Sequence, residues 1–127
     1  MIKQLFTTIS ILTMTVTAYA TPVSPGKCPG VGSIHAAGLN PNAVERDANG
    51  LWAVAMMKNK YDTNALWTFV VGNIMASDAA DAYRKATASL TSLNFEKGPY
   101  PVPQIGRWAC AYSTAAGYPS RAVTPAL

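Results

Sequence analysis

The chain has 127 residues, of which 50% are hydrophobic and 13% are charged, and its formal net charge is +4. This length supports one small domain with a single core, and the hydrophobic share argues against a disordered chain. The basic residues are scattered, with no run longer than Arg84-Lys85, whereas nucleic-acid-binding proteins gather such charge on one face. We therefore expect no nucleic-acid partner.

Residues 1–20 have the pattern of a signal peptide. Lys3 gives a positively charged start, residues 5–18 carry no charge, and Ala18-Tyr19-Ala20 is the small-x-small motif that signal peptidase recognises. An uncleaved membrane anchor is the alternative, but a spanning helix needs about 20 apolar residues. The uncharged segment is shorter than that and contains five threonines. We predict cleavage after Ala20.

The residue after the predicted cleavage site is Thr21 and not a cysteine that would take a lipid. The mature chain, residues 21–127, is therefore expected to be a single domain with no stable membrane anchor. It would be periplasmic or secreted, because the leader directs it out of the cytoplasm. Lys3 is lost with the leader, which leaves nine Lys or Arg residues against six acidic ones.

Two cysteines, Cys28 and Cys110, lie 82 positions apart in the mature chain. An exported protein meets an oxidising compartment, where disulfide bonds form and persist. A reactive thiol or a thiolate metal ligand is the alternative. Neither cysteine lies in a Cys-x-x-Cys spacing, so redox catalysis and covalent haem attachment have no motif behind them. We predict a structural disulfide bond between the two.

The first elements of the mature chain carry weak local signals. Residues 21–32, rich in proline and glycine, read as an extended lead-in, and the alternation over Val31–Gly38 predicts a short strand. Turn signals follow at residues 38–42 and at Asn49-Gly50.

The strongest strand signals are two apolar runs, residues 51–57 and 65–71. They predict an antiparallel hairpin, with the polar residues 58–64 between them. In each run, apolar residues occupy both the odd and the even positions, which point to opposite faces of a sheet. The hairpin strands are therefore covered on both faces, or their second face is used for binding.

A helix is predicted to begin at Ser77 or Asp78 and to run to about Leu93. Asp78 and Asp81 suit the positive start of a helix. Ala79, Tyr83, Ala86, Leu90 and Leu93 recur at helical spacing and form the face that would pack on a sheet.

Proline stands at every second position of residues 99–103, so this segment must be extended. A stiff connector into the last strand is the preferred interpretation, and a proline-rich docking ligand is the alternative. The last strand is predicted over residues 105–113, and residues 119–127 are predicted to be a loose tail. These elements indicate an α+β fold: a three- to four-stranded antiparallel sheet with one helix across a face and one disulfide bond.

No catalytic or metal-binding motif stands out. The single histidine, His35, has no serine in a nucleophile elbow to activate. No cluster of His, Cys, Asp or Glu has zinc spacing, and no loop has calcium-binding alternation. We therefore expect a protein that is not an enzyme and that requires no cofactor.

Methionine and aromatic residues are the remaining candidates for a site. Trp52, Met56 and Met57 lie in the first hairpin strand, Trp67 lies in the second, and Trp108 and Tyr112 flank Cys110. Side chains of this kind most often fill the core. The functional alternative is an apolar surface that accepts a planar ligand or a partner protein.

The leader, Cys28-Pro29-Gly30, the hairpin from Leu51 to Ile74 and Trp108-Ala109-Cys110 together resemble a family of short, uncharacterised exported proteins of Gram-negative intracellular bacteria. Some members of that family carry a hemin-binding label. The resemblance implies hemin as a ligand, held non-covalently because Cys-x-x-Cys-His is absent. It makes His35, Met56, Met57 or Tyr112 the candidate iron ligands, since haem proteins use these residue types.

Two hypotheses of function follow. The first is a small exported binding protein for a planar apolar ligand such as hemin, with Trp52, Trp67 and Trp108 as further contacts. The second is a secreted protein-interaction module, an inhibitor or effector that binds a host or envelope protein through an aromatic surface. A hydrolase has the least support.

Overall fold

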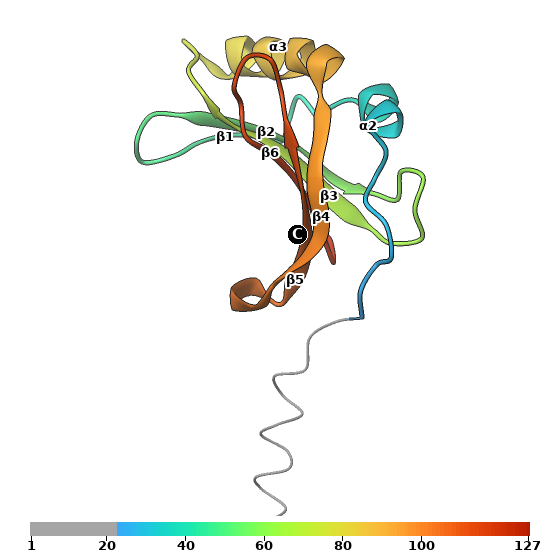
Figure 1. The fold of residues 1–127 in the computed structure, drawn as a ribbon. Helices are drawn as coiled ribbons and strands as arrows, with labels where there is room; N and C mark the ends of the chain where they lie inside the picture. The colour runs from blue at the N-terminus through green and yellow to red at the C-terminus, as the bar shows by residue number, and fades with distance from the viewer. Residues whose placement is uncertain (1–22) are drawn as a thin grey trace, which may run out of the picture.

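The computed structural model describes residues 23–127, so the predicted leader, its cleavage site and Thr21 lie outside the described residues. The described chain forms an antiparallel sheet of six strands in the order β1-β2-β3-β6-β5-β4, with two α-helices (Figure 1). The strands are β1 (Val44–Arg46), β2 (Trp52–Asn59), β3 (Trp67–Ile74), β4 (Asn94–Val102), β5 (Arg107–Ser113) and β6 (Ser120–Thr124). The helices are α2 (Val31–Ala37) and α3 (Ala79–Ser89), with the 3-10 turns η1 (Leu90–Ser92) and η2 (Pro103–Ile105). Among residues 23–127, no helix is long and apolar enough to cross a membrane.

The predicted architecture of three or four strands with one helix is wrong. The protein is built from helices and an antiparallel sheet, as expected, but the sheet has six strands and a second helix is present. Three of the strands, β1, β4 and β6, and helix α2 account for the difference. β1, β6 and α2 are seven residues or shorter, and elements this short carry little periodicity of their own. β4 includes the proline-rich segment that was expected to be a connector.

Residues 31–37 form helix α2 and not the predicted strand. Val31 and Ile34, one helical turn apart, face the core, and Ile34 is completely buried. The backbone N–H of Ile34 donates to the carbonyl of Gly30 at 3.0 Å, and Gly38 ends the helix with a φ of 71°. The alternation of residue types over this segment therefore does not report a buried strand face.

The predicted loose tail is also wrong, because residues 120–124 form β6 in the interior of the sheet. This strand pairs with β3 on one side and with β5 on the other. Ser120, Ala122 and Thr124 are buried. Hydrogen bonding to a strand on each side holds this segment in place. Chain ends are loose only where nothing ties them down.

The hairpin and the long helix are confirmed. Strands β2 and β3 pair antiparallel, with Val54 opposite Val71 and Met56 opposite Phe69. Helix α3 starts after Asp78, whose carboxylate accepts the backbone N–H of Asp81 at 2.8 Å. The proline-rich segment is extended, as expected, and forms part of the edge strand β4, where missing backbone donors are tolerated.

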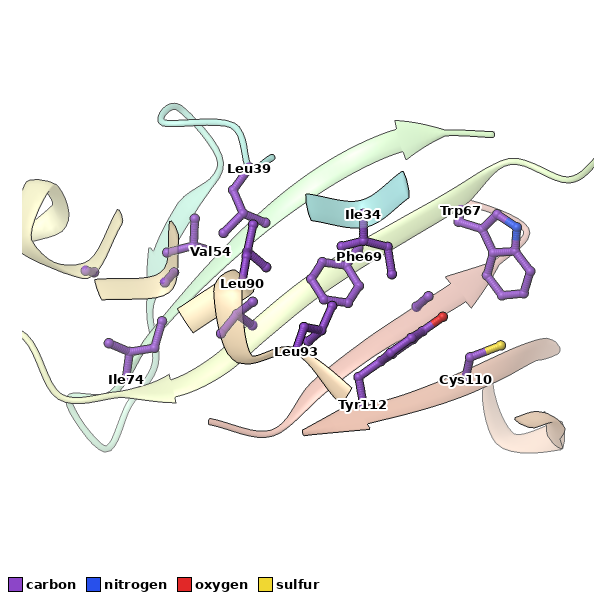
Figure 2. Close-up of a cluster of buried hydrophobic side chains, with 14 residues drawn as sticks. Ile34, Leu39, Val54, Trp67, Phe69, Ile74, Leu90, Leu93, Cys110 and Tyr112 are labelled. Atoms are coloured by element: carbon purple, nitrogen blue, oxygen red, sulfur yellow. The ribbon is translucent and has the colours of Figure 1, made fainter. Parts of the chain in front are cut away.

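The core lies between one face of the sheet and the two helices. Figure 2 shows the rings of Phe69 and Tyr112 close together, with Ile34 and Leu93 beside them and Trp67 and Cys110 at one end of the cluster. The centres of the Phe69 and Tyr112 rings are 5.7 Å apart, and the rings meet edge to face. Because α2, α3 and η1 all contribute to this one cluster, both helices cover the same face of the sheet.

The predicted disulfide bond is confirmed: Cys28 and Cys110 are bonded, with their Cα atoms 5.9 Å apart. It ties the segment before α2 to β5. Gly98 of β4 lies against this bond, with a φ of 131°. A Cβ atom at position 98 would stand 2.8 Å from the carbonyl oxygen of Ala109 and 2.9 Å from the Cα of Cys110.

We expect Gly98→Ala to lower the free energy of unfolding by about 2–4 kcal/mol, because the added methyl group meets backbone atoms and the φ angle is strained for alanine. Gly106→Ala is the matched control: Gly106 also has a positive φ, of 62°, but a Cβ there meets nothing within 4 Å. Its cost should be about 1–2 kcal/mol. Urea denaturation of both variants checks this, and equal losses would show that the close approach at Gly98 is unimportant.

Candidate ligand-binding face

The two faces of the sheet differ sharply. Side chains alternate between faces along each strand, so Phe69 and Val71 point to the helices while Val70 and Gly72 point away. We call the face that points away from α2 and α3 the open face. Its residues in the four inner strands are Ala53, Ala55, Met57, Thr68, Val70, Gly72, Ala109, Ala111, Arg121 and Val123. Of these, Thr68 and Ala109 are completely buried.

The open face is hollowed. The larger hollow has a volume of about 720 Å³ and is floored by Val70, Ala111 and Val123, with Tyr100 and Ile105 among its other lining residues. A smaller hollow of about 160 Å³ lies over Ala53, Ala55 and Met57. Val70 and Leu127 line both, so the two hollows are neighbours on one apolar surface. Pockets that hold small molecules are typically about 300–1,000 Å³ and mostly apolar.

One cation lies in the middle of this surface. Arg121 of β6 stands opposite Val70 of β3 and opposite Ala111 of β5. Among the described residues that line the larger hollow, it is the only one with a charged side chain. Its guanidinium has no ion pair within residues 23–127. An exposed charge on an apolar floor supplies hydrogen-bond donors to whatever enters the hollow.

The residues predicted as ligand contacts are dispersed over the structure. Trp67 and Tyr112 belong to the core: Trp67 is completely buried with its Nε1 donating to the Thr63 hydroxyl at 2.8 Å, and Tyr112 is 3% exposed. The Tyr112 hydroxyl donates to the carbonyl oxygen of Pro29. Neither polar atom is therefore directed at a ligand.

The other tryptophans are half-buried. Trp52 packs against the core, its Nε1 donates to the carbonyl of Ala76 at 3.2 Å, and the guanidinium of Arg46 lies 5.8 Å from its ring centre. Trp108 lies two residues before Cys110 in β5, so both point to the same face of the sheet, and Trp108 stands opposite Thr124 and Pro101. Neither is among the residues that line the two hollows of the open face.

The three non-aromatic candidates do not meet on one face. His35 is exposed on α2. Met56 stands opposite the core residue Phe69, whereas Met57, the next residue along β2, lines the smaller hollow of the open face. Tyr112 is among the residues that line the larger hollow, but its ring packs against Phe69 in the core. The predicted set thus contributes only Met57 as an open-face side chain. Within residues 23–127, no group of three or more His, Cys, Asp or Glu side chains could hold a metal ion.

Tyr112, in the core, and Tyr61, which packs against the core, make a matched pair. The Tyr112 hydroxyl has an acceptor, Pro29, but the buried hydroxyl of Tyr61 has no hydrogen-bond partner. We expect Tyr112→Phe to lower the free energy of unfolding by about 1–2 kcal/mol, since a buried carbonyl loses its donor. Tyr61→Phe should change it by less than about 0.5 kcal/mol or stabilise the protein. Urea denaturation decides; equal costs would contradict this account.

The same tyrosines make stability depend on alkaline pH. Burial raises the pKa of Tyr61 to about 12, and the pKa of Tyr112 is also raised, mainly by burial. In the unfolded chain tyrosine titrates near 10. The unfolded state therefore loses its protons first, and stability that is intact below pH 10 is lost between about pH 10 and 12. Unfolding free energies measured across this range should fall less steeply for Tyr61→Phe; parallel curves would contradict the assignment.

No protein-family model, curated protein or solved structure matches this chain.

Proposed function

We propose that the protein is an exported, non-enzymatic binding protein that holds a planar apolar ligand, with hemin as the candidate, on the open face of its sheet. The observation that carries this proposal is an apolar hollow of about 720 Å³ on a sheet face that the two helices leave uncovered. Covering such a floor with a flat molecule gains roughly 25 cal/mol for each Å² of apolar surface removed from water.

A flat ligand suits this surface better than a long flexible one. The floor is made of small side chains on three adjacent strands, Val70 of β3, Val123 of β6 and Ala111 of β5. Tyr100 and Ile105 also line the larger hollow, and the half-exposed Leu127 lines both hollows. A broad floor with taller side chains around it accepts the face of a ring system.

Export is part of the proposal. The leader pattern of residues 1–20 supports it, and the Cys28–Cys110 bond is of the kind that persists in an oxidising compartment. The test is the intact mass of the protein recovered from the cells that produce it. Loss of residues 1–20 is expected, and a full-length mass in the membrane fraction would contradict export.

Hemin titration of the mature protein tests the ligand proposal. We expect a saturable shift of the Soret band that an unrelated protein of equal hydrophobicity does not produce. Ala111→Phe fills the larger hollow with a side chain that strands accept, and it should weaken binding at least tenfold. Ala88→Phe makes the same change at an exposed position of α3 and should leave binding unchanged.

The result also distinguishes the open face from the histidine predicted as an iron ligand. If His35→Ala abolishes the shift and Ala111→Phe does not, the site lies on the helix side and the proposed face is wrong. If the wild-type protein produces no specific shift, hemin is not the ligand. The alternative is then a partner protein, bound as the interaction-module hypothesis holds.

A further inference from the structure

Arg121 has no evident role in folding. It lies in β6 between two apolar cross-strand neighbours, Val70 and Ala111. It is exposed, and no acidic side chain pairs with it within residues 23–127. By contrast, the guanidinium of Arg107 donates to the carbonyl oxygens of Pro125 and Ile105. An arginine without such contacts, on the floor of a ligand-sized hollow, is best explained by what the hollow binds.

A second cation extends the positive region. Lys97 of β4 stands opposite Ala111 of β5, which in turn stands opposite Arg121 of β6. Residues directly opposite one another in a sheet point to the same face, so the three share the open face. The Lys97 ammonium lies 5.0 Å from the ring centre of Tyr100, a residue that lines the larger hollow. Strands are about 4.8 Å apart, which places the Cα atoms of the two cations about 10 Å apart.

The acidic residues near this face do not neutralise the region. Glu96 accepts the hydroxyl of Ser113, and Glu45 lines the smaller hollow, on the far side of Val70 from Arg121. Among the side chains of the open face, the positive charges therefore lie over β4, β5 and β6, and the one lining carboxylate, that of Glu45, lies toward β1. A ligand that is apolar along its body and anionic at one edge matches this distribution.

We propose that the ligand is an amphipathic carboxylic acid, and that Arg121 recognises its carboxylate while the apolar body lies over Val70 and Val123. This inference rests on the proposed function and narrows the class of its ligand. The planar guanidinium matches a carboxylate with two parallel N–H donors, a geometry that ammonium groups cannot reproduce. Lys97 stands at the margin of the hollow as a second, longer-range attraction.

The experiment compares hemin with its dimethyl ester, which keeps the ring and loses both carboxylates. Affinities are measured for the wild-type mature protein and for Arg121→Gln. The wild type should bind hemin roughly tenfold to a hundredfold more tightly than the ester, because charged hydrogen bonds contribute that much. Arg121→Gln should bind hemin no better than the ester, and its affinity for the ester should equal that of the wild type.

Arg84→Gln is the matched control, since it removes an arginine from α3, where Arg84 pairs with Asp81. It should leave both affinities unchanged. Equal binding of hemin and ester by the wild type overturns this inference and leaves the proposed function standing. An equal loss of both ligands in Arg121→Gln also overturns it, because the arginine would then be structural. Specific binding of neither compound overturns the proposed function and this inference with it.

Discussion

Replacing Cys28 and Cys110 together by alanine is expected to lower the free energy of unfolding by about 3–4.5 kcal/mol. The bond closes a loop of 82 residues, for which the chain-entropy model gives about 4.5 kcal/mol, an upper figure. For a domain of roughly 100 residues, each kcal/mol shifts the melting temperature by about 4–8 °C. The expected loss is therefore a large part of total stability.

The disulfide bond also lies against the core of the domain. Cys110 is completely buried in β5, and the disulfide holds the chain just before α2 against the sheet. After its removal, that segment keeps the Tyr112–Pro29 hydrogen bond and the 2.8 Å bond from the Gly30 N–H to the Asp62 carboxylate. These contacts keep α2 near its place on the sheet. Unlike the disulfide bond, they do not restrict the conformations of the unfolded chain.

Urea denaturation with and without reductant measures the disulfide effect. Reductant should lower the midpoint of the wild type toward that of the double variant and should leave the double variant unchanged. A double variant within about 1 kcal/mol of the wild type would contradict the prediction. Free thiols detected in denatured, non-reduced protein would contradict the bond itself.

Phe69→Ala is the second change with a large expected effect, about 3–5 kcal/mol. The Phe69 side chain is completely buried and meets the Tyr112 ring edge to face, with ring centres 5.7 Å apart. Its removal leaves a cavity between β3 and the elements that pack over it. Phe95→Ala is a matched control, because the Phe95 ring also meets the Tyr112 ring edge to face at 5.7 Å but is 47% exposed.

Because half of Phe95 is already in water, its loss should cost less than about 1.5 kcal/mol. Thermal and urea unfolding of the two variants separate the burial of the ring from the ring–ring contact. If both variants lost the same free energy, the contact with Tyr112 and not the buried volume would dominate the core.

The parts of the fold that were predicted are those with a strong local signal. The two apolar runs of the hairpin each span seven residues, and Asp78 caps α3 through a neighbour three residues away. The disulfide followed from having two cysteines in a chain predicted to be exported. The hairpin and the helix cap depend on residues close together in the sequence. The disulfide bond depends on the oxidising compartment to which the leader directs the chain.

The missed elements depend on distant partners. β6 is five residues long and contains Arg121, so nothing in its own sequence distinguishes it from an exposed tail. Its place in the sheet comes from pairing with β3, about 50 residues earlier. β1 has three residues, and its strand character likewise comes from pairing with β2.

Only part of the candidate site could be predicted from the sequence. Apolar residues on both parities of the hairpin strands indicated a second apolar face, and Val70 and Ala55 lie on it. The charge at its centre was not found, because Arg121 fell in the segment predicted to be loose. Choosing candidates by residue type favoured Trp67 and Tyr112, whose size and aromatic character place them in the core.

Methyl NMR spectra of the mature protein with a diamagnetic gallium analogue of hemin show directly whether a ligand lies on the open face. A porphyrin ring shifts the resonances of methyl groups beneath it. We predict the largest shifts for Val70, Ala111 and Val123, with Ile34 and Leu93 on the helix side unmoved. Shifts concentrated around His35 and Met56, with Val70 and Ala111 unmoved, would contradict the account.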